Sequence, residues 1–278
     1  MRIARLGLTA LLCGCSLVAH AALVVCADPN NMPFSNRHGD GFENGLARIL
    51  ARDLHTTLRY VWWAQRRGFA RETLTQSRCD IWPGVAAGLQ SMATSVPYYR
   101  STYVFVSLVS EPLAHLSLDD PRLRNILIGV QLVGDDGVNT PPATALGMRG
   151  VTSNVRGFPL YGDYRRPNPP NAILDAVVNH SVKLALVWGP LAGYYARHSP
   201  MPLRLEPIAA TPGSVVPMSF AISVGVRRND PQLLARINAA LRGNSAQIER
   251  LLKAYGVPRV AEPTQVANDA THSAKVSR

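Results

Sequence analysis

The sequence lacks any recognisable catalytic, metal-binding or nucleotide-binding motif. Its seven His residues are scattered, with no H-E-x-x-H motif and no Cys/His spacing typical of a metal site. It contains no Gly-x-Ser-x-Gly elbow and no cofactor fingerprint. Dense Lys/Arg runs and basic helices with interleaved aromatics are also missing. These absences argue against a hydrolase, a cofactor- or metal-dependent enzyme and a nucleic-acid-binding protein.

Long apolar runs are lacking too, apart from a short one at the N-terminus. Arg2 and Arg5 precede this run over residues 6–18, and Ala-His-Ala at 19–21 fits a signal peptidase site. The run is too short for a membrane anchor. We therefore expect residues 1–21 to be a cleaved signal peptide and the mature chain to be periplasmic. The alternative is a lipoprotein site around Cys13 and Cys15.

Cysteine is scarce, with four residues in the whole chain. Two of them lie in the predicted signal peptide, which leaves Cys26 and Cys79 in the mature protein. Two cysteines in an exported protein favour a disulfide, because that compartment is oxidising. The alternative is a pair of free, buried thiols.

Acidic residues are few relative to basic ones. The chain has 18 Asp and Glu against 29 Lys and Arg, for a formal net charge of +11, and Arg heavily outnumbers Lys. Such a field favours acidic partners and speeds encounter with them. The alternative is a basic surface without a specific partner.

Apolar patterning predicts alternating strands and helices, typical of an α/β fold with a sheet covered on both faces. Turn-forming residues separate the segments. The predicted strands are 23–27, 57–63, 81–85, 103–109, 126–133, 151–156, 184–188 and 220–226. The predicted helices are 42–54, 69–76, one beginning at 141, 172–178, 191–198, 231–241 and 246–255.

The α/β pattern restarts after its first hundred residues, which predicts two lobes. We expect the first lobe to comprise residues 22–108 and 217–259, and the second to comprise 109–216. The chain would cross between them near 107–113 and 212–218, so the lobes could close around a ligand by hinge motion. Residues 260–278 are polar without periodicity and are predicted to be a flexible tail.

Three local motifs resemble type II periplasmic solute-binding proteins of the family 3 kind. They are Pro33-Phe34, Gly-Phe-Glu at 41–43 and Ser-x-Pro-Tyr-Tyr at 95–99. Longer strings resemble, more specifically, the quinoprotein-dehydrogenase-associated members of MoxJ/XoxJ type. These strings are CADPNNMPFSN, GFEN, YVWWAQRRGF, PYYRSTYVF, IGVQLVGDDGVNTPPATAL and LALVWGPLAGYY.

The resemblance implies a two-lobed fold, in which each lobe is a mixed sheet flanked by helices and two hinge crossovers join them. It also implies a periplasmic accessory to a PQQ-dependent, often lanthanide-containing, alcohol dehydrogenase. Amino-acid-binding relatives place an Arg seven residues before the Ser of the Ser-x-Pro-Tyr motif, where this chain has Gly88. They also carry an Asp after a late strand, where this chain has Gly189. We therefore expect no tight binding of ordinary amino acids.

Candidate ligand-binding residues follow the predicted strands, because α/β folds bind ligands at the carboxyl ends of their strands. They are Asp28, Asn30, Phe34, Arg66, Arg67, Gly84, Tyr98, Tyr99, Arg100, Ser101, Asn139, Thr140 and Trp188.

Three of these candidates, Arg66, Arg67 and Arg100, could hold an acidic ligand such as the tricarboxylate PQQ, since guanidinium suits carboxylate geometry. Alternatively, they pair with local acids such as Asp28 and Glu43. Several other candidates could have a structural role instead of binding a ligand. Asp and Asn could form turns, residues 139–140 could cap a helix, and Trp could pack in the core.

The sequence thus predicts a binding protein that is not an enzyme and has no cofactor of its own. The favoured function is an accessory of a PQQ-dependent methanol or alcohol dehydrogenase, aiding its maturation or activation by binding the enzyme or an acidic ligand. The alternative is the substrate-binding protein of an ABC transporter for a small molecule other than an amino acid.

Overall fold

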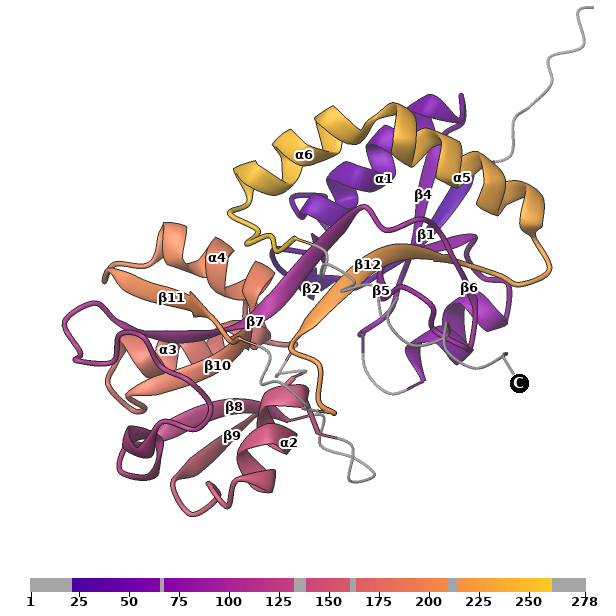
Figure 1. Cartoon of the computed structure of the whole chain (residues 1–278). Helices are drawn as coiled ribbons and strands as arrows, with labels where there is room; N and C mark the ends of the chain where they lie inside the picture. The colour runs from indigo at the N-terminus through magenta and orange to yellow at the C-terminus, as the bar shows by residue number, and fades with distance from the viewer. Residues whose placement is uncertain (1–21, 66–67, 133–138, 161–163, 210–214, 262–278) are drawn as a thin grey trace, which may run out of the picture.

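A computed structural model describes residues 22–65, 68–132, 139–160, 164–209 and 215–261. The chain folds into two α/β lobes joined by long strands (Figure 1). Their strands form one continuous path in the order β4-β1-β5-β12-β7-β10-β8-β9, with β6 and β11 pairing at its side. The predicted two-lobed α/β fold is confirmed. No helix in the described part of the chain is both long and apolar enough to cross a membrane.

The first lobe contains a mixed sheet with its α-helices on one face and the short helix η1 on the other. Strand β1 pairs in parallel with β4 and β5, whereas β12 runs antiparallel to β5. Side chains alternate along β1, so Val25 faces the core under α1 while Cys26 faces the opposite side. The elements are β1 (Leu23–Ala27), β2 (Asn30–Asn31), β3 (Ser35–Asn36), α1 (Phe42–Asp53), β4 (Leu58–Trp62), η1 (Arg71–Thr75), β5 (Ile81–Ala86), β6 (Ala93–Thr94), β12 (Ser219–Val226), α5 (Pro231–Gly243) and α6 (Ser245–Ala254).

The sheet of the second lobe is buried on both of its faces. Leu184 and Leu186 of β10 face the core that includes α2, while Ala185 and Val187 face α3 and α4. This two-sided burial explains why β10 is a continuous apolar run in the sequence. The elements are η2 (Pro121–Arg124), β8 (Ile128–Leu132), α2 (Pro141–Met148), β9 (Val155–Pro159), η3 (Pro169–Asn171), α3 (Ala172–Val178), β10 (Leu184–Trp188), α4 (Gly189–His198) and β11 (Leu203–Pro207).

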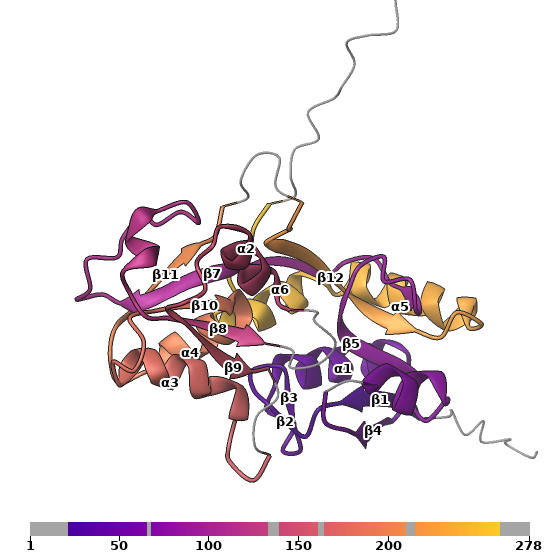
Figure 2. The same ribbon diagram turned by 90° about the horizontal axis from the view of Figure 1, so that it is seen from below.

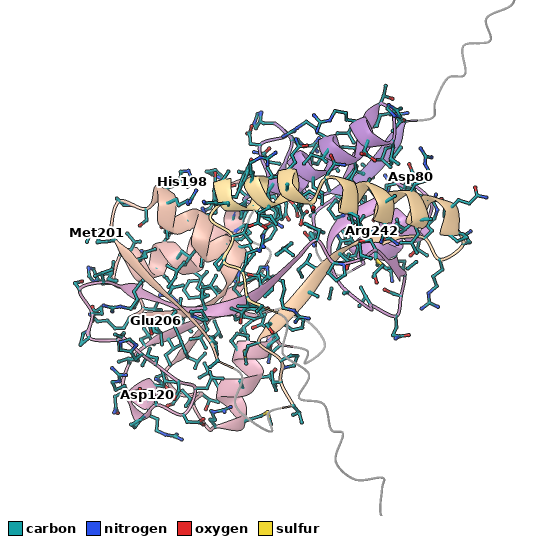
Figure 3. The ribbon with its side chains drawn as sticks, turned by 45° about the horizontal axis from the view of Figure 1, so that its top comes forward. Asp80, Asp120, His198, Met201, Glu206 and Arg242 are labelled. Carbon is teal, nitrogen blue, oxygen red and sulfur yellow. A yellow bond between two sulfur atoms is a disulfide. The ribbon has the colours of Figure 1, made fainter. Side chains whose placement is uncertain are left out.

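Strand β7 (Tyr99–Leu108) belongs to both lobes. Its residues up to Thr102 pair with β12, and those from Tyr103 pair with β10. The chain therefore passes between the lobes a few residues before the predicted range 107–113. Figure 2 shows the lobes side by side, with the β2–β3 hairpin at their boundary. Figure 3 shows both lobes filled with side chains, with Asp80 and Arg242 on the first lobe and Asp120 and Glu206 on the second.

The end of α6 and the segment after it contact β7 and α4. The Ser101 hydroxyl donates a hydrogen bond to the Pro258 carbonyl at 2.6 Å, and the Val260 amide donates to the Arg100 carbonyl at 3.2 Å. The Arg197 guanidinium of α4 donates to the Ala254 carbonyl at 2.7 Å. The Arg197–Ala254 hydrogen bond therefore adds a contact between the lobes at the C-terminal end of α6.

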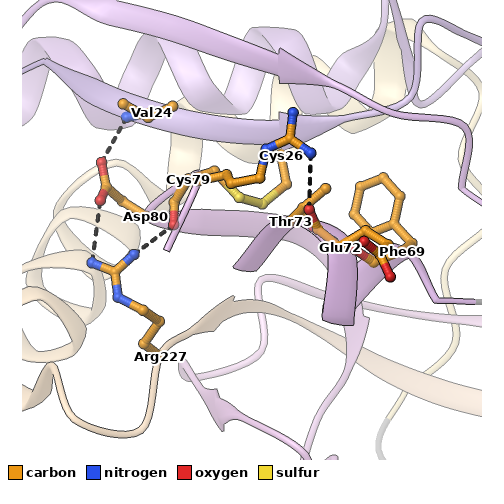
Figure 4. The surroundings of a disulfide bond; sticks show 9 residues. Val24, Cys26, Phe69, Glu72, Thr73, Cys79, Asp80 and Arg227 are labelled. Carbon is orange, nitrogen blue, oxygen red and sulfur yellow. Dashed lines mark hydrogen bonds and ion pairs between the residues drawn. A yellow bond between two sulfur atoms is a disulfide. The ribbon is translucent and has the colours of Figure 1, made fainter. Parts of the chain in front are cut away.

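A disulfide joins Cys26 to Cys79, with their Cα atoms 5.5 Å apart (Figure 4). The next residue, Asp80, extends this link: its carboxylate accepts a hydrogen bond from the Val24 amide at 2.8 Å and pairs with Arg227 at 3.3 Å. The bridge and the carboxylate together fix β1 against the start of β5, where the strand ladder itself contributes one register pair.

Candidate functional site

A pocket of about 420 Å³ lies between the two lobes. Residues of both lobes line it, and its described walls are predominantly aromatic and apolar. The lining consists of Asp28, Asn31, Phe34, Glu43, Gln65, Phe69, Trp82, Gly84, Ala86, Tyr99, Tyr103, Gln131, Pro141, Leu160, Tyr164, Pro170, Trp188, Leu191, Phe220 and Ile222.

The first turn of α1 places Glu43 in the pocket. Gly41 caps this helix in an extended conformation, and the Glu43 amide donates to the Phe34 carbonyl at 2.9 Å. Gly84 leaves room for the carboxylate, because a Cβ on Gly84 would lie 2.1 Å from the Glu43 Oε1 atom. Gly84 also has φ +80°, a conformation that favours glycine. The absence of a side chain at Gly84 of β5 thus creates the space into which Glu43 projects.

Glu43 is a buried acid that has no partner among the described residues. Its exposed fraction is 7%, and no residue that the structure describes forms a hydrogen bond or ion pair with its carboxylate. Burial raises the pKa of Glu43 well above its usual value, and the negative charge of Asp28 raises it further.

Asp28 is also buried, but its carboxylate already accepts three hydrogen bonds. It accepts hydrogen bonds from the amides of Asn30 and Gln65, at 2.8 and 2.6 Å, and from the Tyr164 hydroxyl. Tyr164 belongs to the second lobe, so Asp28 organises the first-lobe loop and links it across the pocket.

The side chain of Asn30 reinforces this closure. It donates to the Arg166 carbonyl at 2.8 Å and accepts from the Asn168 amide at 3.0 Å. These contacts and the Asp28–Tyr164 bond form an interlobe latch at one edge of the pocket.

Aromatic rings form the wall where the lobes meet. Tyr103, Trp188 and Phe220 come from β7, β10 and β12, and each pair of their rings packs edge to face. Burial raises the pKa of Tyr103 to about 12, so its hydroxyl is neutral at physiological pH. Tyr99, whose ring packs on Phe42, continues this wall toward Glu43.

The predicted site residues take several different places. Five of them, Asp28, Phe34, Gly84, Tyr99 and Trp188, line the pocket. Asn30 belongs to the latch, and Asn139 is exposed beside the second lobe. Arg66 and Arg67 lie outside the described residues.

Four further predicted residues have structural contacts rather than a place in the pocket wall. The Ser101 hydroxyl bonds Pro258, and the Thr140 hydroxyl donates to the Gln131 carbonyl at 2.6 Å. Tyr98 packs against the first-lobe core with its hydroxyl buried. Arg100 lies in β7, where its backbone is in register with Ala221 of β12, and its Nε atom is buried.

Among the lining residues that the sequence did not indicate are Glu43, Tyr103, Gln131, Tyr164 and Phe220. Glu43 was named only as an acid for neighbouring Arg, although it stands in the Gly-Phe-Glu motif. An acid in the first turn of a helix is usually explained by the helix dipole. The sequence does show an acid at the start of a helix, Glu43, and a glycine inside a strand, Gly84. That these two residues are in contact can be seen only in the folded structure.

Replacing Tyr164 by Phe is expected to loosen the latch and lower the free energy of unfolding by about 1.5 kcal/mol, because a hydrogen bond to a buried charge is lost. Small-angle scattering should then show a larger radius of gyration. Tyr195→Phe is the matched control, since it removes a hydroxyl bond to Asp175 within the second lobe. Equal scattering profiles for Tyr164→Phe and the wild type would contradict the latch.

Replacing Glu43 by Gln is expected to change how stability depends on pH. Because its folded-state pKa is raised, Glu43 favours folding fully below its unfolded pKa, and this contribution is lost as pH rises through the folded pKa. The wild type should therefore lose stability relative to Glu43→Gln as the pH rises above the usual pKa of a glutamate. Chemical unfolding across that range measures this difference. A constant difference at every pH would contradict a raised pKa.

Comparisons with known proteins agree with this architecture. No family model matches the chain. The chain is 31% identical over 249 residues to Protein MoxJ of Methylorubrum extorquens, covering 85% of this chain and 81% of the relative. It is 34% identical, with a TM-score of 0.71, to the crystal structure of the periplasmic binding protein XoxJ from Methylobacterium extorquens AM1; the match covers 87% of this chain and 100% of that one. MxaJ from Methlophaga aminisulfidivorans MPT is 28% identical, with a TM-score of 0.72, over 86% of this chain and 100% of its own.

Proposed function

The chain belongs to the MoxJ/XoxJ family of periplasmic binding proteins, and we propose that it is an accessory of a PQQ-dependent alcohol dehydrogenase. In this proposal it binds the enzyme without catalysing a reaction and assists its maturation or activation. The observation that carries the proposal is the 34% identity to XoxJ, a similarity that spans that protein's whole length. The sequence strings shared with dehydrogenase-associated members support the link to the enzyme.

Export to the periplasm is part of the proposal. The N-terminal segment has the composition of a cleaved signal peptide, and the Cys26–Cys79 disulfide suits an oxidising compartment. The relatives are periplasmic binding proteins, which supports the same location.

A basic groove between α1 and α6 is the surface that we propose for the dehydrogenase. Arg48, Arg52 and Arg250 line it and are exposed. Clustered positive charge favours an acidic patch on a partner and increases the association rate. The formal charge of +11 for the whole chain adds a long-range attraction of the same sign.

The pocket gives less support to an acidic ligand such as PQQ. Of the described lining residues, none is Arg or Lys, whereas Asp28 and Glu43 are acids. Arg100 is absent from this lining, and Arg66 and Arg67 lie outside the described residues. The proposal therefore depends on contact with the dehydrogenase and does not require PQQ to be bound in the pocket.

Affinity capture tests the proposal directly. The purified mature chain is immobilised and exposed to the cognate dehydrogenase, loaded with PQQ or depleted of it. We expect saturable binding to at least one form. The double variant Arg48→Glu/Arg250→Glu should bind more weakly, while Arg228→Glu/Arg242→Glu, which changes the net charge equally on the same lobe, should bind normally. Absence of binding to both forms of the enzyme would contradict the proposal.

A second candidate is a solute receptor for an ABC importer, which the pocket between the lobes favours. A ligand that binds only the folded state raises its apparent stability, so thermal shift detects it. A clear shift with a small solute, combined with no contact with the dehydrogenase, would support this second function.

A further inference from the structure

We propose that the pocket between the lobes binds a small organic cation, an alkylated ammonium ion, with its charge beside Glu43 and its alkyl groups against the aromatic wall. This goes beyond the association with a dehydrogenase, and it holds or fails independently because it concerns the isolated chain. Four features of the described residues lead to it: an unpaired buried acid, a second acid that is already satisfied, a wall of aromatic rings and a lining without Arg or Lys.

The unpaired acid determines the sign of the ligand's charge. Glu43 is more than nine-tenths buried, faces the pocket and has no hydrogen-bond or ion-pair partner among the described residues. Leaving a buried carboxylate unpaired is costly, so a cation arriving beside it removes that cost and gains the attraction. An anion in the same place would be repelled by Asp28 and would raise the pKa of Glu43 still further.

Asp28 strengthens this preference without competing for the ligand. Its carboxylate already accepts three hydrogen bonds, including that from Tyr164. Its negative charge therefore acts on the ligand through space, while Glu43 remains available for direct contact. Among the described residues no group of three or more His, Cys, Asp or Glu gathers to hold a metal ion, so two carboxylates with an aromatic wall favour an organic cation.

The aromatic wall indicates what surrounds the charge. Tyr103, Trp188 and Phe220 are half-buried rings in mutual edge-to-face contact, and all three line the pocket. Aromatic faces attract cations, and cages of such rings recognise quaternary ammonium groups. Tyr99 extends the aromatic wall toward Glu43. One ligand can therefore place its charge beside Glu43 and its alkyl groups against the rings.

The largely apolar lining favours an alkylated ammonium over a primary amine. A primary ammonium group carries three N–H donors, each of which needs an acceptor when buried. Besides the Glu43 carboxylate, the described lining offers scattered acceptors, namely the side-chain amides of Asn31 and Gln131 and the hydroxyls of Tyr99 and Tyr103, set in a largely apolar surface. An ammonium whose hydrogens are replaced by methyl groups leaves few donors or none unsatisfied.

Calorimetric titration with three molecules of nearly equal shape tests the proposal. Choline is the cation, 3,3-dimethyl-1-butanol its neutral analogue, and 3,3-dimethylbutanoate the anion. Tetramethylammonium is titrated as the charged group alone. In slightly alkaline buffer, we expect choline or tetramethylammonium to bind the wild type at least about tenfold more tightly than the alcohol or the anion, by cation–π attraction and the Glu43 charge.

Two variants and a control assign the binding to the site. Glu43→Gln should weaken binding of the cation by about tenfold or more, because the charge is lost while the shape is kept. Trp188→Leu should also weaken it. Glu249→Gln, which removes an exposed acid paired with Arg259 on α6, should bind the cation normally. Failure of both cations to bind, tighter binding of the alcohol or the anion, or unchanged binding by Glu43→Gln would overturn the proposal, whatever the outcome with the dehydrogenase.

Discussion

Replacing both Cys26 and Cys79 by alanine is expected to lower the free energy of unfolding by about 4 kcal/mol, according to the chain-entropy estimate for a loop of this length. The two residues are 53 positions apart, and the segment between them contains α1, β4 and the acids of the pocket. The bridge restricts this long segment in the unfolded chain, which is the source of the estimated gain.

Apart from the hydrogen bonds between Asp80 and Val24, few local contacts could replace the bridge. β1 and β5 share a single register pair, Val25 with Ile81, so the sulfur–sulfur link is a major tie between these neighbours. Both cysteines are buried in a small cluster with Phe69 and Leu74, which separates them from solvent.

Urea unfolding of the oxidised wild type, the reduced wild type and the double alanine variant measures this effect. Reduction should reproduce most of the loss in the wild type and change nothing in the variant. Thiol titration of the unreduced, denatured mature chain should find no free thiol. Two free thiols, or equal stability of the wild type and the variant, would contradict a structural disulfide.

Replacing Gly84 by Ala is expected to lower the free energy of unfolding by about 3 kcal/mol, from backbone strain and overpacking together. The backbone conformation at Gly84 has φ +80°, and the new Cβ would lie 2.1 Å from the Glu43 Oε1 atom. Glu43 must then withdraw from the pocket, so the same change should abolish cation binding.

Gly88→Ala separates these two contributions. Gly88 has φ +76°, but nothing lies within 4 Å of the position where its Cβ would stand. Its substitution should therefore carry the backbone cost alone. A double-mutant cycle isolates the clash: Glu43→Ala combined with Gly84→Ala should be more stable than the sum of the separate changes predicts. Strict additivity would show that the two side chains do not meet.

The buried elements could be predicted from the sequence because their residues face a core on both sides. The apolar run 184–188 coincides with β10, and 23–27 coincides with β1. Helix α3 was also predicted with its observed bounds, Ala172–Val178.

The edge strands could not be predicted in this way. β9 was expected at 151–156 and is found at Val155–Pro159, where it is mostly exposed and contains Gly157. β11 was missed because its residues, LRLEP, alternate with charged side chains and pair on one side with β7. Edge strands carry a weak sequence signal, since pairing rather than burial defines them.

The pocket illustrates a similar limit. The sequence identified loop residues that follow strands, such as Asp28 and Phe34, because the topology of α/β sheets places them together. It could not identify Glu43, whose exposure to the pocket depends on the conformation of Gly84, or Tyr164, which reaches Asp28 from a segment 136 positions away. Both depend on contacts between distant parts of the chain.

The role as a dehydrogenase accessory is tested most directly by the activity of the enzyme itself. The cognate PQQ-dependent alcohol dehydrogenase is purified from cells with and without this chain and assayed with PQQ and its metal supplied. We predict low activity for the enzyme made without the chain, and recovery when the purified mature chain is added. Equal activity of the two preparations, unchanged by the added chain, would contradict that role.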